Sequence, residues 1–235
     1  MVDFIIHSVD WALNKYFDKS LASKNVHILD PFTGTGTFIT RTLYYLKQQM
    51  DEGKITYDDI LRKYMHELHA NEIILLSYYI AAINIEAVFD DVNGPNRGYK
   101  PFDGIVLTDT FESTERQDTL DDDMFGINNQ RLKLQQETPI TVIMSNPPYQ
   151  KIKNSANDIN DKVYYPNLAN EIENTYAKLS DSNLKNALQD SYLRAFKWAS
   201  LRIKDRGIIG YITNNGNSSH YIKDIFPFFF YLFFT

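Results

Sequence analysis

The sequence lacks several features that would each point to a particular class of protein. It contains no cysteine, so disulfide bonds and thiolate metal sites are excluded, and nothing in it requires an oxidising compartment. Its five histidines are scattered and form no metal-ligand pattern such as HExxH, so we predict no metal site. No basic segment followed by an apolar stretch opens the chain, so we expect a cytoplasmic location with no membrane partner.

The composition that remains is typical of one soluble globular domain. At 235 residues the chain is long enough for a full core and somewhat long for two domains. A hydrophobic content of 43% and a charged content of 23% fit that class. The net charge of -6 argues against a surface that grips phosphate everywhere, although it is compatible with a local basic patch.

The last ten residues, FPFFFYLFFT, hold six of the fifteen phenylalanines and no charged residue. The run is too short to span a bilayer as a helix, and it lacks the alternation of a half-buried strand. A deeply buried strand is one interpretation. We favour a truncated or frame-shifted end, or an aggregation-prone edge, and we therefore expect residues 220–235 to be an aberrant end.

Strand-like and helix-like patterns alternate along the rest of the chain. Strands are expected at 26–32, 64–72, 102–111, 140–149 and 207–215. Helices are expected near the start of the chain and at 38–50, 56–64, 72–89 and 190–203, with Thr56 as an N-cap and Asp59 three residues later. We expect residues 112–138 to form a solvated connection, and residues 151–189 to form a long mobile insertion with one or two weak helices.

This alternation predicts an α/β fold whose parallel sheet is covered by helices on both faces. Ligands of such sheets bind beyond the carboxyl ends of the strands, where the strand order reverses. Each of the first four expected strands ends in a polar or Gly/Pro feature. We therefore expect these four features to converge on one edge of the sheet.

The first feature is the segment DPFTGTGTF at 30–38. Gly34 and Gly36 allow a tight turn with close approach to a ligand, and the following helix offers its N-terminal N–H groups. No Gly-Lys-Ser/Thr follows, so it is not a P-loop, and Ile39 takes the third glycine position of GxGxxG. A bare GxG favours an ordinary strand-to-helix turn. With Asp30 and Pro31 before it, a ligand site is the better interpretation.

The second and third features are single acids at strand ends. Glu72 is well placed to accept hydrogen bonds from ribose hydroxyls, although strand-end acids are commonly helix caps and Glu67 is a rival. Asp109 can accept a hydrogen bond from an adenine amino group, and an Asx turn is an equally good explanation. Each signal alone is weak.

The fourth feature is Asn146-Pro147-Pro148-Tyr149. The prolines fix φ and stiffen the turn, which leaves carbonyl oxygens, including that of Pro147, free to act as acceptors. Asn146 adds a side-chain oxygen, and two acceptors close together suit a planar amino group. Tyr149 offers a stacking face. An isolated proline pair would indicate only a strand end, but the flanking Asn and Tyr make the motif more specific.

These motifs, in this order, resemble the S-adenosylmethionine-dependent adenine-specific DNA methyltransferases. Residues 163–215 resemble the methyltransferase region of type ISP single-chain restriction–modification enzymes, which also carry nuclease and helicase parts. The opening VDFIIHSVDWALNKYF is similar to part of the family's N-terminal cofactor motif, so the resemblance covers nearly all of residues 2–219. It implies a Rossmann-like, mostly parallel sheet whose C-terminal strands are incomplete here, since the family has seven.

The resemblance also implies roles for these residues. The glycine turn would hold the methionine part of S-adenosylmethionine, with Asp30 near its amino group, while Glu72 would bind the ribose and Asp109 the adenine. A target adenine flipped out of double-stranded DNA would meet the acceptors of Asn146 and Pro147 and stack on Tyr149. No histidine base is required. The implied cofactor residues are Asp30, Pro31, Phe32, Gly34, Gly36, Thr37, Glu72 and Asp109, and the implied catalytic residues are Asn146, Pro147, Pro148 and Tyr149.

We therefore expect residues 1–219 to be a methyltransferase catalytic domain without its target-recognition domain. Such a fragment would bind cofactor weakly and would not methylate DNA alone, and the natural protein would be fused to helicase and nuclease parts. Two alternatives stay open. NPPY also occurs in enzymes that methylate RNA bases or protein glutamine, and the chain could be an inactive remnant of a larger protein.

Overall fold

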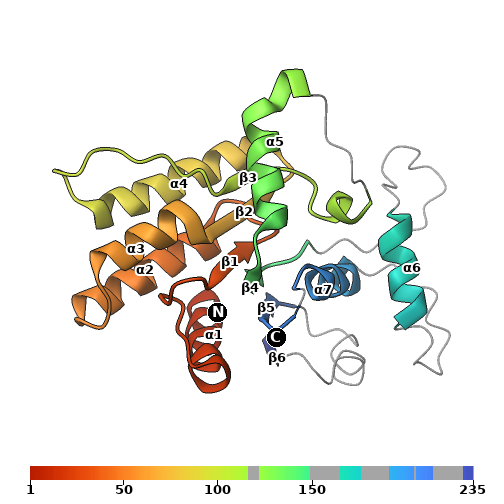
Figure 1. Cartoon of the computed structure of the whole chain (residues 1–235), viewed down its shortest axis with the longest axis horizontal. Helices are drawn as coiled ribbons and strands as arrows, with labels where there is room; N and C mark the ends of the chain where they lie inside the picture. The colour runs from red at the N-terminus through yellow and green to blue at the C-terminus, as the bar shows by residue number, and fades with distance from the viewer. Residues whose placement is uncertain (116–121, 149–164, 176–190, 204, 214–229, 235) are drawn as a thin grey trace.

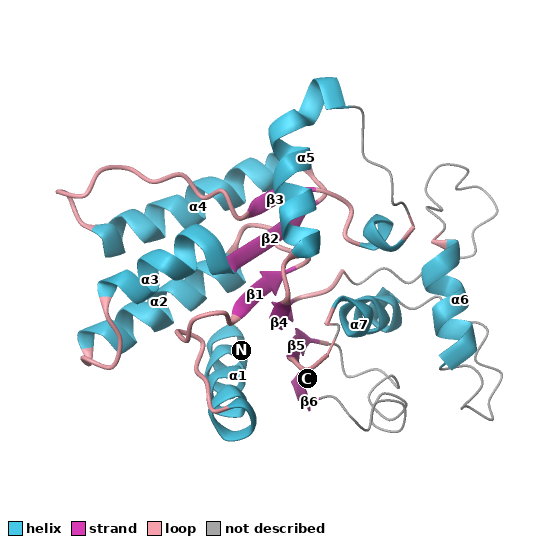
Figure 2. Cartoon of the chain, in the orientation of Figure 1, coloured by secondary structure: helices cyan, strands magenta, loops and turns pink. Residues whose placement is uncertain are grey.

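A six-stranded sheet with helices on both faces organises the computed structural model, which describes residues 1–115, 122–148, 165–175, 191–203, 205–213 and 230–234 (Figures 1 and 2). The strand order is β3-β2-β1-β4-β5-β6, and every neighbouring pair is parallel. The strands are β1 (His27–Asp30), β2 (Leu68–Glu72), β3 (Ile105–Leu107), β4 (Ile140–Ser145), β5 (Ile208–Ile212) and β6 (Phe230–Phe234). The α/β prediction is confirmed.

Helices connect the strands and form the two outer layers. The α-helices are α1 (Val2–Phe17), α2 (Thr37–Asp51), α3 (Tyr57–Arg62), α4 (Leu75–Asn93), α5 (Asp122–Glu137), α6 (Pro166–Thr175) and α7 (Ser191–Arg202). Two short turns add to them, the π-helical η1 (Lys63–Glu67) and the 3-10 turn η2 (Phe111–Thr114). The predicted N-cap of the third helix is confirmed, because Thr56 and Asp59 form a capping box. No helix within the described ranges is both long and apolar enough to cross a membrane.

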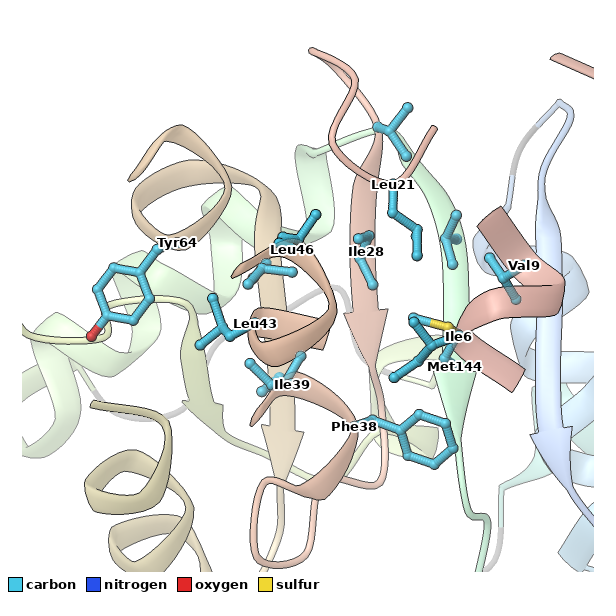
Figure 3. Packing of buried hydrophobic residues seen from close by; sticks show 14 of the residues in the cluster. Ile6, Val9, Leu21, Ile28, Phe38, Ile39, Leu43, Leu46, Tyr64 and Met144 are labelled. Carbon is cyan, nitrogen blue, oxygen red and sulfur yellow. The ribbon is translucent and has the colours of Figure 1, made fainter. Parts of the chain in front are cut away.

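Two hydrophobic cores fill the space between the sheet and these layers. Successive strand residues point to opposite faces, so Ile28 joins the core under α1, α2 and α4, and Leu29 joins the core under α6 and α7. Figure 3 shows the first core, where Phe38 of α2 and Ile6 of α1 lie near Met144 of β4. Burial on both faces explains why most of the strands have almost continuous apolar sequences, although β2 includes the buried polar residues His69 and Asn71.

The order in which strands are added to the sheet reverses between β1 and β4. From β1 the chain builds outward through β2 to β3, and it then crosses back to add β4, β5 and β6 on the other side. The carboxyl ends of β1 and β4 are therefore neighbours, and this is the position where parallel α/β sheets bind ligands.

Two sequence predictions need correction. Residues 63–67 form η1 rather than the start of a strand, because Lys63 and Glu67 pair on one helical turn while their charges are buried. Residues 112–138 are not a solvated connection. They contain η2 and α5, and Asn128 of α5 exchanges two hydrogen bonds with the backbone of Leu107 at the edge strand.

The remaining predictions fall partly outside the described residues. Within 151–189 the structure describes α6, whose Leu168 and Ile172 are buried, so at least this helix belongs to the packed core. Within 220–235 it describes β6, which pairs in parallel with β5. The interpretation of this segment as a strand therefore holds for Phe230–Phe234.

Candidate functional site at the carboxyl edge of the sheet

The glycine turn after β1 forms the centre of the candidate site. Gly34 and Gly36 have φ angles of +56° and +87°, in the left-handed region that favours glycine. A Cβ on Gly36 would lie 3.2 Å from the Ile85 side chain, so this glycine lets the turn pack closely on α4, whereas a Cβ on Gly34 would meet nothing within 4 Å. Gly36 is the N-cap of α2 and makes no side-chain cap. The turn therefore presents one open glycine and an uncapped helix N-terminus.

Neighbouring strands hold this turn in place. The Gly34 N–H donates to Oε2 of Glu72 at 2.8 Å, and the Thr33 N–H donates to the carbonyl of Asn71 at 3.0 Å, both on β2. From the segment after β3, the Thr110 hydroxyl donates to the carbonyl of Pro31 at 2.5 Å. The turn is thus fixed by hydrogen bonds from β2 and β3.

Asp30 lies beneath the turn and is 1% exposed. Its Oδ1 accepts the Phe32 N–H at 3.2 Å and the Ser145 hydroxyl at 2.5 Å, while Oδ2 is buried without a hydrogen-bond partner among the described residues. Burial raises the pKa of Asp30 to about 7, and nearby Glu72 adds to that effect. Asp30 therefore supports the turn through Oδ1, while its buried Oδ2 can still accept a hydrogen bond.

Glu72 ends β2, and its carboxylate already accepts two backbone N–H groups. Oε2 accepts from Gly34, and Oε1 accepts from Ile74 at 2.7 Å. Each carboxylate oxygen has a further lone pair, so the fixed group can still accept from a ligand. Ile73 and Ile74, next along the chain, are 62% and 59% exposed, which places apolar surface beside this acid.

Asp109 lies two residues beyond β3 and forms an Asx turn. Its Oδ1 accepts the Phe111 N–H at 2.9 Å, as the simpler sequence interpretation expected, and its Oδ2 accepts the Tyr165 hydroxyl at 2.6 Å. Burial and the hydrogen bond to Asp109 raise the pKa of Tyr165 above its usual range. Phe111 packs against Phe32 of the glycine turn at a ring distance of 5.3 Å, so an aromatic floor joins the two strand ends.

The Asn-Pro-Pro segment leaves the carboxyl end of β4. Asn146 and Pro148 are exposed and Pro147 is buried, while Tyr149 lies outside the described residues. Ser145 immediately precedes this segment and is fully buried against Asp30 of the neighbouring strand. The segment therefore starts beside the glycine turn, at the point where the sheet reverses.

The predicted site residues that the structure describes meet at one edge of the sheet. They are Asp30, Pro31, Phe32, Gly34, Gly36, Thr37, Glu72, Asp109, Asn146, Pro147 and Pro148. Glu67, the rival to Glu72, lies in η1 before β2 and bonds to Lys63, so it belongs to the opposite edge. No group of three or more His, Asp or Glu side chains in the described ranges could hold a metal ion.

Sequence reasoning did not identify Ser145, Thr110 or Ile73 as parts of this edge. A serine after five strand residues and a threonine after an aspartate carry no signal in one sequence. The isoleucine pair after Glu72 was only a weak signal. Apolar residues are common at the start of a helix, and only the structure shows that these two are exposed.

Comparisons with known proteins agree with this geometry. The family model described as N-6 DNA Methylase matches residues 12–181. The DNA-bound ATP-dependent type ISP restriction–modification enzyme LlaBIII is 63% identical over 91% of this chain, with a TM-score of 0.87. A nuclease-deletion mutant of the type ISP enzyme LlaGI, in complex with a DNA substrate mimic, is 62% identical over 89% of the chain, with a TM-score of 0.86.

A more distant relative extends the series. The DrdV–DNA complex is 38% identical over 89% of the chain, with a TM-score of 0.78. The chain spans only 14%, 17% and 19% of LlaBIII, LlaGI and DrdV, respectively. No curated protein matches the chain.

Proposed function

Because the chain belongs to the N-6 DNA methylase family, we propose that it is a catalytic domain that transfers a methyl group from S-adenosylmethionine to the exocyclic amino group of adenine in DNA, within a larger restriction–modification enzyme.

The order of the functional residues along the sheet edge carries this proposal. Asp109 follows β3, Glu72 ends β2, the glycine turn follows β1 and Asn146 follows β4, and these four strands are consecutive neighbours. The proposed roles on these strands are adenine, ribose, methionine and methyl acceptor, which is the order of the groups along the cofactor and on to its target. Neighbouring strands are about 4.8 Å apart, so adenine and methionine positions separated by two strands are about 10 Å apart.

The residues on the cofactor side suit the groups they would hold. Glu72 has spare lone pairs for the ribose hydroxyls, and exposed Ile73 offers an apolar face for a purine ring. The N-terminus of α2, which has no side-chain cap, suits a carboxylate. Oδ2 of Asp30, which has no hydrogen-bond partner among the described residues, favours an ammonium group near the turn. When bound, the cofactor would supply a methyl group on a sulfonium, which is already a good leaving group.

On the acceptor side, the protein contributes position rather than acid–base chemistry. The side-chain oxygen of Asn146 and the carbonyl of Pro147 would accept the two N–H bonds of the amino group and so direct its lone pair toward the methyl group. Tyr149 would stack on the flipped adenine. This role needs no histidine of neutral pKa.

DNA is the favoured substrate because LlaBIII and LlaGI are restriction–modification enzymes whose structures hold DNA or a DNA substrate mimic, and DrdV is also in a DNA complex. The chain itself carries a net charge of -6, so we propose that the basic, sequence-reading surface lies in other parts of the enzyme. RNA bases and protein glutamine present the same planar amino group and are therefore the alternatives to test.

Isothermal titration of S-adenosylmethionine into the chain tests the cofactor side. We expect saturable binding, with Thr42→Val as a control that loses a buried hydroxyl bonded within α2. A folded chain, judged by circular dichroism, that produces no heat would contradict the proposal.

On the substrate side, tritiated-methyl transfer by a full-length enzyme containing this domain is measured with duplex DNA, RNA and protein acceptors. Transfer to duplex DNA alone is expected, and transfer only to RNA or protein would replace the substrate.

A further inference from the structure

Ser145 links the two halves of the site. It is the last residue of β4, directly before Asn146, and its hydroxyl donates to Oδ1 of Asp30 across 115 residues of sequence. The two residues end the neighbouring strands at the reversal point of the sheet. One side chain therefore connects the acceptor segment to the support of the glycine turn.

A serine at this position is not explained by strand packing. The preceding residues of β4 are mostly apolar, and Ser145 is 0% exposed, where an unbonded hydroxyl would be costly. The single hydroxyl bond goes to a carboxylate that is itself 1% exposed, and hydrogen bonds to charged groups are about twice as strong as neutral ones. Ser145 and Asp30 thus stabilise each other in a place where neither would be favourable alone.

The surroundings of Asp30 make this hydroxyl important for the charge of the carboxylate. Glu72 of β2 opposes ionisation of Asp30, and the buried Tyr211 of β5 offers no positive charge. The groups that favour the anion are the Ser145 hydroxyl and the Phe32 N–H. Without Ser145, burial would push the pKa of Asp30 still higher than about 7, and the acid would be neutral at physiological pH.

We propose that Ser145 is a positioning residue that holds Asp30 oriented and ionised beneath the glycine turn, and so strengthens the binding of S-adenosylmethionine. The inference rests on the proposed function. Ser145 acts through Asp30 and does not contact the ligand. Because Ser145 also precedes Asn146, the same bond keeps the acceptor segment in register with the bound cofactor.

The test is calorimetric titration of S-adenosylmethionine between pH 6 and pH 9 with the unchanged chain, Ser145→Ala and Ser145→Thr. Loss of the hydroxyl should weaken binding about fivefold near pH 7, move the pH midpoint of affinity upward by about one unit, and leave affinity nearly normal at pH 9. Ser145→Thr keeps the hydroxyl and should restore the profile. Thr42→Val loses a buried hydroxyl in α2 and should leave it unchanged.

A double-mutant cycle separates this role from a general loss of stability. In an Asp30→Asn background, Ser145→Ala should change affinity less than about twofold, because its effect passes through the missing carboxylate. Additive losses, or a uniform loss with an unchanged midpoint, would overturn the inference. If the unchanged chain binds and Ser145→Ala matches it at every pH, only this inference fails. If the folded, unchanged chain does not bind, the proposed function fails and takes this inference with it.

Discussion

The two edges of the sheet both bury charged groups, but among the described residues only the amino edge pairs its buried carboxylate with a cation. At the amino edge, the Lys63 ammonium has three donors and uses them on Glu67 and on the carbonyls of Ser23 and Val26, each at 2.7 Å. The Asn25 N–H completes Glu67 at 2.7 Å. Each charge of this pair is thus balanced by an opposite charge, and the role of the network is structural.

At the carboxyl edge, two buried side chains have oxygens that can still accept hydrogen bonds. Asp30 has a buried oxygen without a hydrogen-bond partner in the described part of the chain, and so does the Asn71 side chain beside it. Gly34 leaves open space where a side chain would be. A buried acceptor without a partner costs stability, and here it lies beside the open glycine of the turn, which indicates a place prepared for a ligand.

The largest effect on stability should come from breaking the buried Lys63–Glu67 pair at the amino edge. Lys63→Met leaves Glu67 buried without its main partner and should lower the free energy of unfolding by about 3–5 kcal/mol. Urea denaturation measures this loss. Lys47→Met removes an exposed i,i+4 pair with Asp51 and should cost less than about 0.5 kcal/mol. Equal losses in the two variants would show that the buried network is not special.

At the carboxyl edge, a single substitution should lower the rate of methyl transfer and leave the free energy of unfolding nearly unchanged. Asn146→Ala, in a full-length enzyme that contains this domain, should reduce methyl transfer by at least about 100-fold, because a fixed polar contact to the reacting group is lost. Cofactor affinity and unfolding free energy should hardly change, since Asn146 is exposed. Retained transfer would refute its assigned role. Asn14→Ala, on the exposed surface of α1, is the matched control.

The two edges should also respond to pH with opposite signs. Burial lowers the pKa of His69 at the amino side to about 3, so protons bind the unfolded chain more readily below pH 6.5 and stability is lost as pH falls. Burial raises the pKa of Asp30 to about 7, so its contribution is lost as pH rises from about 4 to 7. Each slope is at most about 1.4 kcal/mol per pH unit, and between pH 5 and 6.5 the two should nearly cancel.

Single substitutions separate these opposing slopes. Asp30→Asn should reveal stability that rises by about 2 kcal/mol from pH 5 to 6.5, while His69→Gln should reveal stability that falls over the same window. Urea unfolding at a series of pH values measures both, and His7→Gln, an exposed histidine, serves as the control. Parallel profiles in the two variants would show that the buried groups do not titrate as assigned.

The sequence predicted which residues lie at the carboxyl edge better than it predicted the contacts between them. Strand-like segments ending at Asp30, Glu72 and Asn146 identified strand ends, and parallel topology brings such ends together without further information. The Ser145–Asp30 bond depends on β1 and β4 being neighbours, and no local pattern shows that. Likewise α5 was missed because its sequence is mostly polar and its contacts to the sheet edge come from Asn128, not from an apolar stripe.

Alanine substitutions at two glycines distinguish the open glycine of the site from an ordinary one. Gly34 and Gly53 both have positive φ angles, and a Cβ on either would meet nothing within 4 Å. Alanine at each should therefore cost about 1–2 kcal/mol of unfolding free energy, from backbone strain alone. Only Gly34→Ala should also weaken S-adenosylmethionine binding, by about tenfold, because its Cβ would occupy the space above the turn. Equal affinities in the two variants would mean that the open space at Gly34 does not receive the cofactor.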